Sequence, residues 1–452
     1  MSAPPQPAPA WRSLLDRALA SLARLMLRVF FRDVELVGLE RVPRGRPLLV
    51  VANHVNSIAD PLLLLAFLDV RPRILAKNTL FSHPFVGPLL WLVGALPVYR
   101  RQDARALVTR NFATFEACRK VLARGGCVVL FPEGTSHNEP RQRPLKTGAA
   151  RLALEAERSS AGLGLLILPV GLTYEQKQRF RSRVLLQVGE PIDPAAEAAQ
   201  YRTGSRSALR VLTARIAGAL EGVTVNFESW DEARLVARAV ALFEGDPSGQ
   251  SVQLYRRARL WAAFARAYHA IQARDPERLA QLVLLLDEYD RRYSARAAQA
   301  QARSAAAASG PWLRLLAPLG LLLNYVPYRL VGAVSRRLSR TPDEPATYML
   351  LGGLLFFPLW WLLQALLLGF ALRPGLGLLA LLLAPPLGVT SLKALEQREG
   401  FVHRLGAGPD GSQADLQDLE QRIRRELQDL THAHADLLGS ELSPDAGKMR
   451  PV

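Results

Sequence analysis

Apolar and polar positions alternate with two different periods along residues 33–200. Longer segments with helical spacing, at 60–68, 103–125 and 148–159, lie between short apolar runs. The short runs are bounded by turn residues and predict strands; they are VELVGLE (34–40), PLLVVAN (47–53), ALPVYR (95–100), CVVLFPEG (127–134), LLILPVGLTY (165–174) and RVLLQVGEPI (183–192). This alternation predicts an α/β domain over residues 33–200, with a mostly parallel sheet flanked by helices.

The segments on either side of this domain have helical patterns. Residues 11–32 place apolar side chains every three or four positions with Arg between them, which predicts an amphipathic basic helix. That helix either packs on the next domain or lies on a membrane surface. Residues 205–305 are expected to form a helical region, and 411–452 an amphipathic helix with a tail. The Pro/Ala-rich residues 1–10 are expected to be disordered and show no secretory signal.

Residues 311–392 form a hydrophobic region. Arg373 is the only charged residue between Pro345 and Leu392. It interrupts two apolar runs, each long enough to cross a bilayer at about 20 residues per crossing. Basic residues flank the pair, so we predict a hairpin at 346–392 with both ends on the cytoplasmic side.

Two further points about this region stay open at the level of sequence. The hairpin could instead be buried inside a soluble domain. The run LLAPLGLLLNYVPY (315–328) is too short to span a membrane, and we expect it to be interfacial or re-entrant.

Charge and cysteine content narrow the class of protein. The formal net charge of +17 would suit nucleic acid, an anionic membrane surface or a phosphate-bearing substrate. No RNP-like motif, zinc finger or basic tail supports nucleic acid, so we expect no nucleic-acid partner. The only two cysteines, Cys118 and Cys127, form neither a disulfide framework nor a zinc pattern, and they suit a reducing compartment.

The stretch VANHVNSIADPLLL (51–64) carries the first candidate for chemistry. Asp60 precedes Pro61 and an apolar run, which predicts that Asp60 caps a helix beginning there. The same carboxylate has a second oxygen that could hold the ring of His54. His54 and Asp60 do not have helical i,i+3 or i,i+4 spacing, so the loop between them must curl back to join them.

Four blocks in a fixed order give the pattern its specificity. They are NHVNSIAD (53–60), GALPVYR (94–100), FPEGTSH (131–137) and ILPVGLTY (167–174). Together they resemble the glycerolipid acyltransferase family, also called PlsC-type or lysophospholipid acyltransferase-like, over roughly residues 30–195. The element KTGAARLAL after the third block adds to the resemblance. The resemblance implies the fold of that family, followed here by the helical region and the C-terminal hydrophobic hairpin.

One departure bears on the acceptor. Five residues separate His54 from Asp60, whereas the family usually has four. The longer block resembles the branch with glycerol-3-phosphate and dihydroxyacetone-phosphate acyltransferases. The choice between glycerol-3-phosphate and its 1-acyl derivative therefore stays open.

Acyl transfer from a thioester to a hydroxyl needs a base, and His has a suitable pKa. We expect His54 to be that base and Asp60 to fix its tautomer and stabilise the imidazolium. The substrate hydroxyl takes the place of an enzyme serine, so no acyl-enzyme is required. Cys127 is expected in a buried strand, and Ser57 lacks a nucleophile elbow.

The resemblance also implies an acceptor site. It assigns the glycerol phosphate to Arg100, Glu133 and Gly134, with Glu133 taking a glycerol hydroxyl or orienting an Arg. Further candidates for phosphate binding are Lys146, Arg151, Thr135 and Ser136, although each could equally be a surface or loop-capping residue. Pro169 is expected to shape the acyl-donor side.

We therefore expect a membrane-associated O-acyltransferase of phospholipid synthesis. Its partners would be a phospholipid membrane, a glycerol phosphate or lysophosphatidate acceptor, and acyl-CoA or acyl carrier protein as co-substrate, with no cofactor and no metal. We expect it at the cytoplasmic face of a bacterial inner membrane. The alternatives are another lysophospholipid acceptor or a catalytically silent membrane scaffold, against which the intact His54, Asp60 and Glu133 argue.

Overall fold

The computed structural model describes residues 10–82, 86–98, 111–160, 162–201, 206–244, 252–303, 311–405 and 412–433. Residues 1–9 and Arg100, and the tail after residue 433, lie outside the described residues, so the expectations for them stay predictions. The chain divides into two compact units. Unit 1 comprises Met1–Asn226 and Arg340–Leu350, and unit 2 comprises Phe227–Ser339 and Leu351–Val452.

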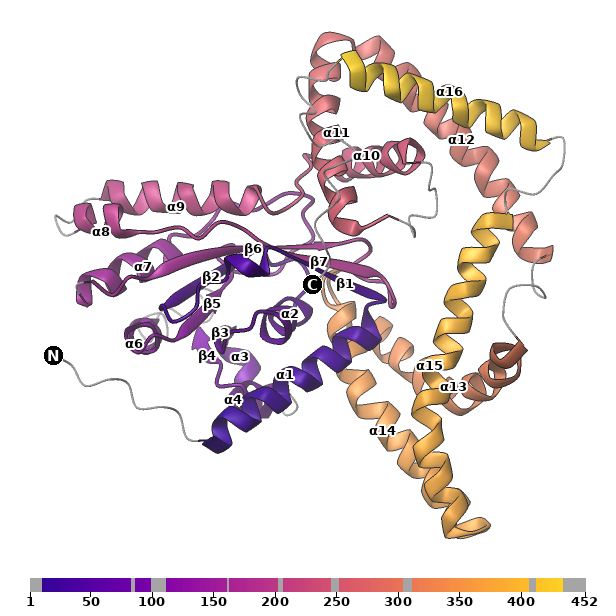
Figure 1. Ribbon diagram of the computed structural model, residues 1–452, viewed down its shortest axis with the longest axis horizontal. Helices are drawn as coiled ribbons and strands as arrows, with labels where there is room; N and C mark the ends of the chain where they lie inside the picture. Colours follow the sequence, from indigo (N-terminus) through magenta and orange to yellow (C-terminus); the bar gives the residue numbers. More distant parts are fainter. Residues whose placement is uncertain are drawn as a thin grey trace. The chain divides into compact units, whose positions relative to one another are not determined.

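Unit 1 is built on a seven-stranded sheet (Figure 1). Its strands are β1 (Asp33–Val37), β2 (Leu48–Ala52), β3 (Pro72–Lys77), β4 (Leu96–Val98), β5 (Cys127–Leu130), β6 (Leu166–Tyr174) and β7 (Arg183–Val188). Their spatial order is β1-β7-β6-β2-β5-β3-β4, and every pair is parallel except β6 with β7. The expected α/β domain with a mostly parallel sheet is confirmed.

Strand β2 lies near the middle of this sheet. It pairs in parallel with β5 on one side and with β6 on the other. All five of its residues, LLVVA, are buried. A strand buried on both faces reads as a continuous apolar run, as the sequence of β2 does.

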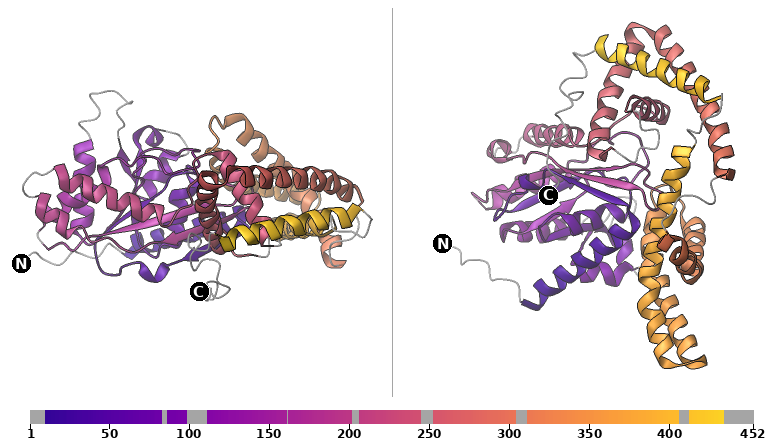
Figure 2. Two further views of the ribbon diagram at one scale, coloured as in Figure 1. Left: turned by 90° about the horizontal axis from the view of Figure 1, so that it is seen from above. Right: turned by 45° about the vertical axis from the view of Figure 1, so that its right-hand side comes forward.

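Helices cover both faces of the sheet (Figures 1 and 2). Leu48, Val50 and Ala52 of β2 pack with α1, α2 and residues 346–350. Leu49 and Val51 face the other way, toward α6, α7 and α9. The helices of unit 1 are α1 (Ala10–Phe30), α2 (Ala59–Phe67), α3 (Asn78–Phe81), α4 (Val86–Leu92), α6 (Asn111–Ala123), α7 (Gly148–Ser159), α8 (Ala195–Tyr201) and α9 (Arg206–Glu221), with a 3-10 turn η1 (Leu39–Arg41).

The amphipathic helix α1 packs on the rest of unit 1, which is one of the two roles expected for it. It packs against α2, with Leu27 fully buried. The Nε of Arg24 donates to the carbonyl oxygen of Ala66 at 2.5 Å. Leu14 and Leu25 are about 60% exposed, so an apolar stripe remains on the outer side of the helix.

Three features of unit 1 differ from the sequence expectations. Strand β3, PRILAK, was not expected, because its charged residues break the apolar run that marks the other strands. Helix α9 packs on the sheet through Leu212 and Ile216, so unit 1 runs to Asn226 and not to residue 200. Residues 340–350 also belong to unit 1, which no local pattern indicated.

Unit 2 is helical throughout the part that the structure describes. Its helices are α10 (Trp230–Phe243), α11 (Leu254–Arg274), α12 (Pro276–Arg303), α13 (Pro311–Leu338), α14 (Pro345–Ala371, whose first turn belongs to unit 1), α15 (Pro374–Leu405) and α16 (Ser412–Ala433). Helices α10, α11, α12 and α16 share one apolar core, to which α16 contributes Ile423 and Leu427.

Helices α14 and α15 are the two described helices that are long and apolar enough to cross a membrane. No residue in the most apolar stretch of α14 is buried, and few residues in that of α15 are buried. Phe370 is 98% exposed. Because so much apolar surface is uncovered, these helices do not have the environment of a buried core hairpin.

Helix α13 lies beside α15 (Figures 1 and 2). The expected short run at 315–328 is part of this 28-residue helix, although Pro318 and Pro327 fall inside it. Proline lacks an N–H, so Pro327 leaves the carbonyl oxygen of Leu323 without its helical partner. Trp360 and Gln364 of α14 donate to that oxygen at 2.8 and 3.0 Å. The proline therefore provides an acceptor that joins α13 to α14.

Candidate active site

Three neighbouring strands end at the candidate site. Strand β2 leads directly into Asn53 and His54, β5 leads into the loop with Glu133, and β6 ends at Tyr174. Because β5, β2 and β6 are parallel neighbours, their carboxyl ends meet at one edge of the sheet. This edge is where α/β sheets bind their ligands.

His54 and Asp60 are brought together as the sequence predicted. The Nδ1 atom of His54 lies 2.8 Å from Oδ2 of Asp60. The His54 side chain is 16% exposed, whereas Asp60 is fully buried. Ser57, in the loop between them, has a φ of 38°, the left-handed region that reverses the chain direction.

Asp60 is not the helix cap that its position before Pro61 suggested. Helix α2 begins at Ala59, its N-cap is Ile58, and the cap makes no side-chain hydrogen bond. The carboxylate of Asp60 instead turns back to the preceding loop. There Oδ2 accepts the backbone N–H groups of Val55 and Asn56, each at 2.8 Å.

The second oxygen of Asp60 is also occupied. Tyr174 donates its hydroxyl to Oδ1 at 2.5 Å. Burial, with the charge and hydrogen bond of Asp60, raises the pKa of Tyr174 well above its usual value. The phenol therefore stays protonated and acts as a donor. With four donors around it, Asp60 is held as an acceptor on both oxygens.

This arrangement decides the state of the His54 ring. Since Asp60 offers only acceptors, Nδ1 of His54 carries the proton and donates it to Oδ2. Nε2 then has a lone pair, and it has no hydrogen-bond partner among the described residues. Phe131 stacks on the imidazole with ring centroids 4.1 Å apart and planes inclined by 17°. The ring is thus fixed in position and exposes one basic nitrogen.

Asn53 anchors the start of this loop. Its side-chain amide donates to the carbonyl oxygen of Leu172 at 2.9 Å, and its Oδ1 accepts the Leu172 N–H at 2.8 Å. The side chain of Asn53 thereby continues the hydrogen bonding between β2 and β6 by one residue. His54 is the next residue, so its backbone is attached to a fixed part of the sheet.

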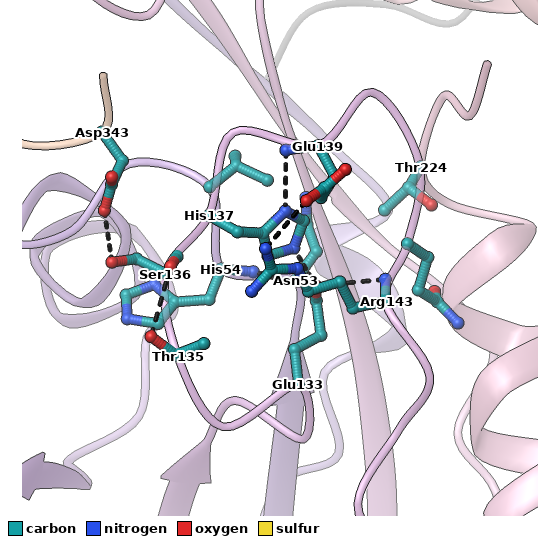
Figure 3. A network of polar contacts seen from close by, with 12 residues as sticks. Asn53, His54, Glu133, Thr135, Ser136, His137, Glu139, Arg143, Thr224 and Asp343 are labelled. Carbon is teal, nitrogen blue, oxygen red and sulfur yellow. Dashed lines mark hydrogen bonds and ion pairs between the residues drawn. The ribbon is translucent and has the colours of Figure 1, made fainter. Parts of the chain in front are cut away.

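Glu133 supports His54 from the neighbouring loop (Figure 3). Its Oε1 accepts the backbone N–H of His54 at 3.1 Å. Its Oε2 accepts from Nε2 of His137, and the backbone N–H of Arg143 lies at 3.4 Å from the same oxygen. The Glu133 side chain is fully buried. Both oxygens are used within the protein, which does not fit the expected contact with a glycerol hydroxyl or with an Arg side chain.

His137 has a defined tautomer as well. The N–H of Glu139 donates to Nδ1 of His137 at 3.1 Å, so Nδ1 is an acceptor and Nε2 carries the proton. The backbone N–H of His137 donates to the carbonyl oxygen of His54 at 3.1 Å. His137 therefore braces His54. No role was expected for it, since its i,i+4 spacing from Glu133 falls in a loop without periodicity.

Residues 33–173, which contain these elements, match the family model described as Acyltransferase. The chain carries an acyltransferase domain. The expected resemblance to PlsC-type acyltransferases is confirmed. Within this domain His54 and Asp60 follow β2, and Glu133 follows β5.

Several known proteins are similar to part of this chain. An uncharacterized acyltransferase of Schizosaccharomyces pombe is 26% identical over 306 residues, 49% of this chain and 45% of that protein. Glycerol-3-phosphate O-acyltransferase 2 of Saccharomyces cerevisiae is 33% identical over 135 residues, 30% of this chain and 18% of that protein. The 1-acyl-sn-glycerol-3-phosphate acyltransferase of Borreliella burgdorferi is 29% identical over 154 residues, 34% of this chain and 56% of that protein.

The chain thus spans less than two thirds of the length of each of these relatives. Among solved structures, the 1-acyl-sn-glycerophosphate (LPA) acyltransferase PlsC from Thermotoga maritima aligns with a TM-score of 0.36 at 24% identity. That alignment covers 47% of this chain and 79% of the other.

The other residues expected to bind substrate have different surroundings in the structure. Gly134 has a φ of 79°, and a Cβ there would meet the Lys146 side chain at 2.3 Å. The Gly134 N–H donates to the carbonyl oxygen of Phe131 at 2.9 Å, so this amide is not free for an anion. Glycine therefore serves here to let Lys146 lie across the loop. Lys146 and Arg151 are exposed, and Thr135 contacts the carbonyl oxygen of Ser136.

Lys177, between β6 and β7, was not foreseen. Its Nζ donates to the carbonyl oxygens of Val55 and His137 at 2.8 and 3.2 Å. Burial lowers its pKa, and the charges of Asp60 and Asp343 oppose that shift. Lys177 thus ties the two loops of the acyltransferase domain together. A single Lys in a turn gives no sequence signal of this kind.

Metal-ligating side chains do not gather in this region. Within the described ranges no group of three or more His, Cys, Asp or Glu side chains could hold a metal ion. The cysteines are separate, and burial raises the pKa of both thiols to about 12.

Proposed function

We propose that the protein transfers an acyl group from a thioester to a hydroxyl of glycerol-3-phosphate or 1-acyl-glycerol-3-phosphate. The observation that carries this proposal is the buried Asp60 that holds Nδ1 of His54, so that Nε2 can act as a base. The names of the yeast and Borreliella relatives supply both acceptors.

The reaction follows from the orientation of His54. Nε2 takes the proton of the acceptor hydroxyl as that oxygen attacks the thioester carbonyl. Asp60 stabilises the resulting imidazolium. The new C–O bond forms, the C–S bond breaks, and the leaving thiolate takes the proton back from Nε2. No covalent enzyme intermediate is needed, and the donor is acyl-CoA or acyl carrier protein.

The acceptor phosphate needs cations. Lys146 lies over Gly134, in the loop that supports His54, and its side chain is exposed. It is the described candidate that we favour. Arg100, outside the described residues, remains a prediction, and so does Arg151. An Arg bound to phosphate through two nitrogens would be a strong contact.

A membrane location completes the proposal. The exposed apolar surfaces of α14 and α15 support insertion into a bilayer. The cytoplasmic face of a bacterial inner membrane remains our expectation, although the relatives come from both bacteria and eukaryotes. If the two helices span, the protein resists carbonate extraction and needs detergent for release.

The decisive experiment assays purified full-length protein with each acceptor and each donor in turn. We expect His54→Ala to lower kcat by about 10²–10⁴-fold, the usual contribution of a general base. His269→Ala is a matched control, because this exposed His of unit 2 also contacts a carboxylate, that of Glu232. Near-normal turnover by His54→Ala, or no transfer to any acceptor by wild-type protein, would contradict the proposal.

A further inference from the structure

Residues Arg340–Leu350 return to unit 1 from a distant part of the sequence. Ala346 and Leu350 are buried in the same core cluster as α2 and β2. Thr341 and Glu344 close the turn before α14, since the N–H of Glu344 donates to the Thr341 carbonyl oxygen at 3.2 Å. This segment is therefore an integral part of the acyltransferase unit.

The segment contacts each of the three loops at the site. The N–H of Ile58, between His54 and Asp60, donates to Oγ1 of Thr347 at 3.3 Å. Nε2 of Gln178, between β6 and β7, donates to the carbonyl oxygen of Pro342 at 2.9 Å. In the loop after β5, Ser136 donates its hydroxyl to the carboxylate of Asp343 (Figure 3).

Asp343 is a charged group in a buried place. Its exposed fraction is 6%. Burial acts to raise its pKa, but hydrogen bonds from Ser136 and Thr341 and the charge of Lys177 outweigh burial and hold the pKa below the usual value. Asp343 is thus a carboxylate at neutral pH, and Lys177 lies within the influence of both Asp343 and Asp60.

We propose that Asp343 is a positioning residue for the reaction at His54, acting through Ser136 and Lys177. Ser136 lies next to His137, whose N–H holds the His54 carbonyl oxygen. Lys177 holds the carbonyl oxygens of Val55 and His137. Asp343 binds the first of these residues and balances the charge of the second. It thereby holds the His54 loop and the His137 loop in register with each other.

The kinetic part of this proposal rests on the proposed function. In Asp343→Asn the Ser136 hydroxyl keeps an acceptor but Lys177 loses a counter-charge. We expect kcat to fall by about 10- to 100-fold, because small displacements of a reacting group cost up to about 10² in rate. KM for both substrates should stay within about twofold, since Asp343 touches neither.

Hydrogen exchange tests the same idea without any substrate. Amides of peptides 53–60 and 131–139 should exchange at least about threefold faster in Asp343→Asn and in Thr347→Val than in wild-type protein. Asp69→Asn is the matched control, since Asp69 is an exposed carboxylate of unit 1. In Asp343→Ala, which removes both the Ser136 contact and the counter-charge of Lys177, adding Ser136→Ala should cost no further activity, because Ser136 acts through Asp343.

The kinetic and the hydrogen-exchange experiments distinguish a failure of the positioning role from a failure of the proposed function. A kcat for Asp343→Asn within twofold of wild type, or a rise in KM for the phosphate acceptor alone, would overturn the positioning role. Unchanged exchange in both loops would overturn it as well. If Asp343→Asn does not fold, Ser136→Ala and Thr347→Val carry both readouts. If wild-type protein transfers no acyl group, the proposed function fails and the exchange arm still decides the role of Asp343.

Discussion

Two groups of polar side chains, one around His54 in unit 1 and one around Asn324 in unit 2, lie at least partly buried among packed elements. The group around His54 includes charges: buried Asp60 and Glu133 and partly buried Lys177 all take backbone partners from loops. Around Asn324 they are neutral. Its Nδ2 donates to the carbonyl oxygen of Ala384 at 3.1 Å, and its Oδ1 accepts from Trp361 at 2.8 Å.

Both regions follow the same physical rule, that buried polar groups must be hydrogen-bonded, but they follow it with different kinds of side chain. A buried polar group is costly unless it is hydrogen-bonded, and a buried charge is costlier still. In unit 1 the charges would serve the proposed proton transfer, and many loop amides and carbonyl oxygens hold them. Among α13, α14 and α15, neutral side chains join the helices through carbonyl oxygens.

The largest expected effect comes from Asp60→Asn. An amide at residue 60 has one acceptor oxygen, so it cannot accept both from the His54 loop and from Tyr174, and without a charge it cannot stabilise an imidazolium. We expect kcat to fall by about 10³–10⁴-fold, as for a neutralised triad aspartate. We also expect a lower melting temperature than for His54→Ala, because the loop amides of Val55 and Asn56 bond to a neutral oxygen in place of a charged one and Tyr174 loses its acceptor. Kinetics and thermal unfolding of both variants test this, and equal melting temperatures would show that Asp60 does not organise the loop.

Tyr174→Phe removes one donor from Asp60 and leaves the other three. Hydrogen bonds to charged groups contribute about 1.5–3 kcal/mol, so we expect kcat to fall by about tenfold or somewhat more. The protein should stay folded, since Phe has nearly the same shape. Measured kcat at saturating substrates is the readout. A loss as large as that of Asp60→Asn would give Tyr174 a direct part in the chemistry.

In unit 2 a neutral pair should affect stability and not activity. Trp360→Phe/Gln364→Leu leaves the Leu323 carbonyl oxygen without a partner, at a cost of about 1–3 kcal/mol. Adding Pro327→Ala restores the helical N–H and should recover part of that loss. Thermal unfolding in detergent measures both steps. If Pro327→Ala gives no recovery in the double variant, the freed carbonyl is not what joins α13 to α14.

The smallest expected effect is none. Cys127 lies in β5 and Cys118 in α6, both buried, with thiol pKa values raised to about 12. At pH 8 only about one thiol in 10⁴ would be ionised, so alkylating reagents should leave the native enzyme active. Cys127→Ala should likewise keep wild-type kcat. Rapid inactivation that acyl donor prevents would restore a covalent route as an alternative.

Local pattern was sufficient for much of unit 1. The apolar runs indicated β2, β5, β6 and β7, and the helix expected at 148–159 coincides with α7. The pairing of His54 with Asp60 also followed from the sequence, because its chemistry requires it. These features depend on residues near one another in the chain or on a reaction that constrains their types.

Features set by distant partners could not be found this way. Asp60 looked like a cap because Pro61 follows it. In the structure its oxygens accept hydrogen bonds from Val55, Asn56 and Tyr174 instead. Glu133 looked like a substrate ligand until its buried partners were visible. Lys177 has no local signature, since its partners lie about 40 and 120 residues away. Periodicity carries no information about such contacts.

The return of residues 340–350 to unit 1 has a consequence for the order of folding. A chain grows from its N-terminus, and domains generally fold as units in that order. Here Asp343 is made 207 residues after its partner Ser136, and Thr347 is made 289 residues after its partner Ile58. A nascent chain therefore completes its sheet long before it completes the surroundings of His54. The last contacts arrive with the first turn of α14, so the catalytic loops reach their final arrangement only as the apolar helices are being made.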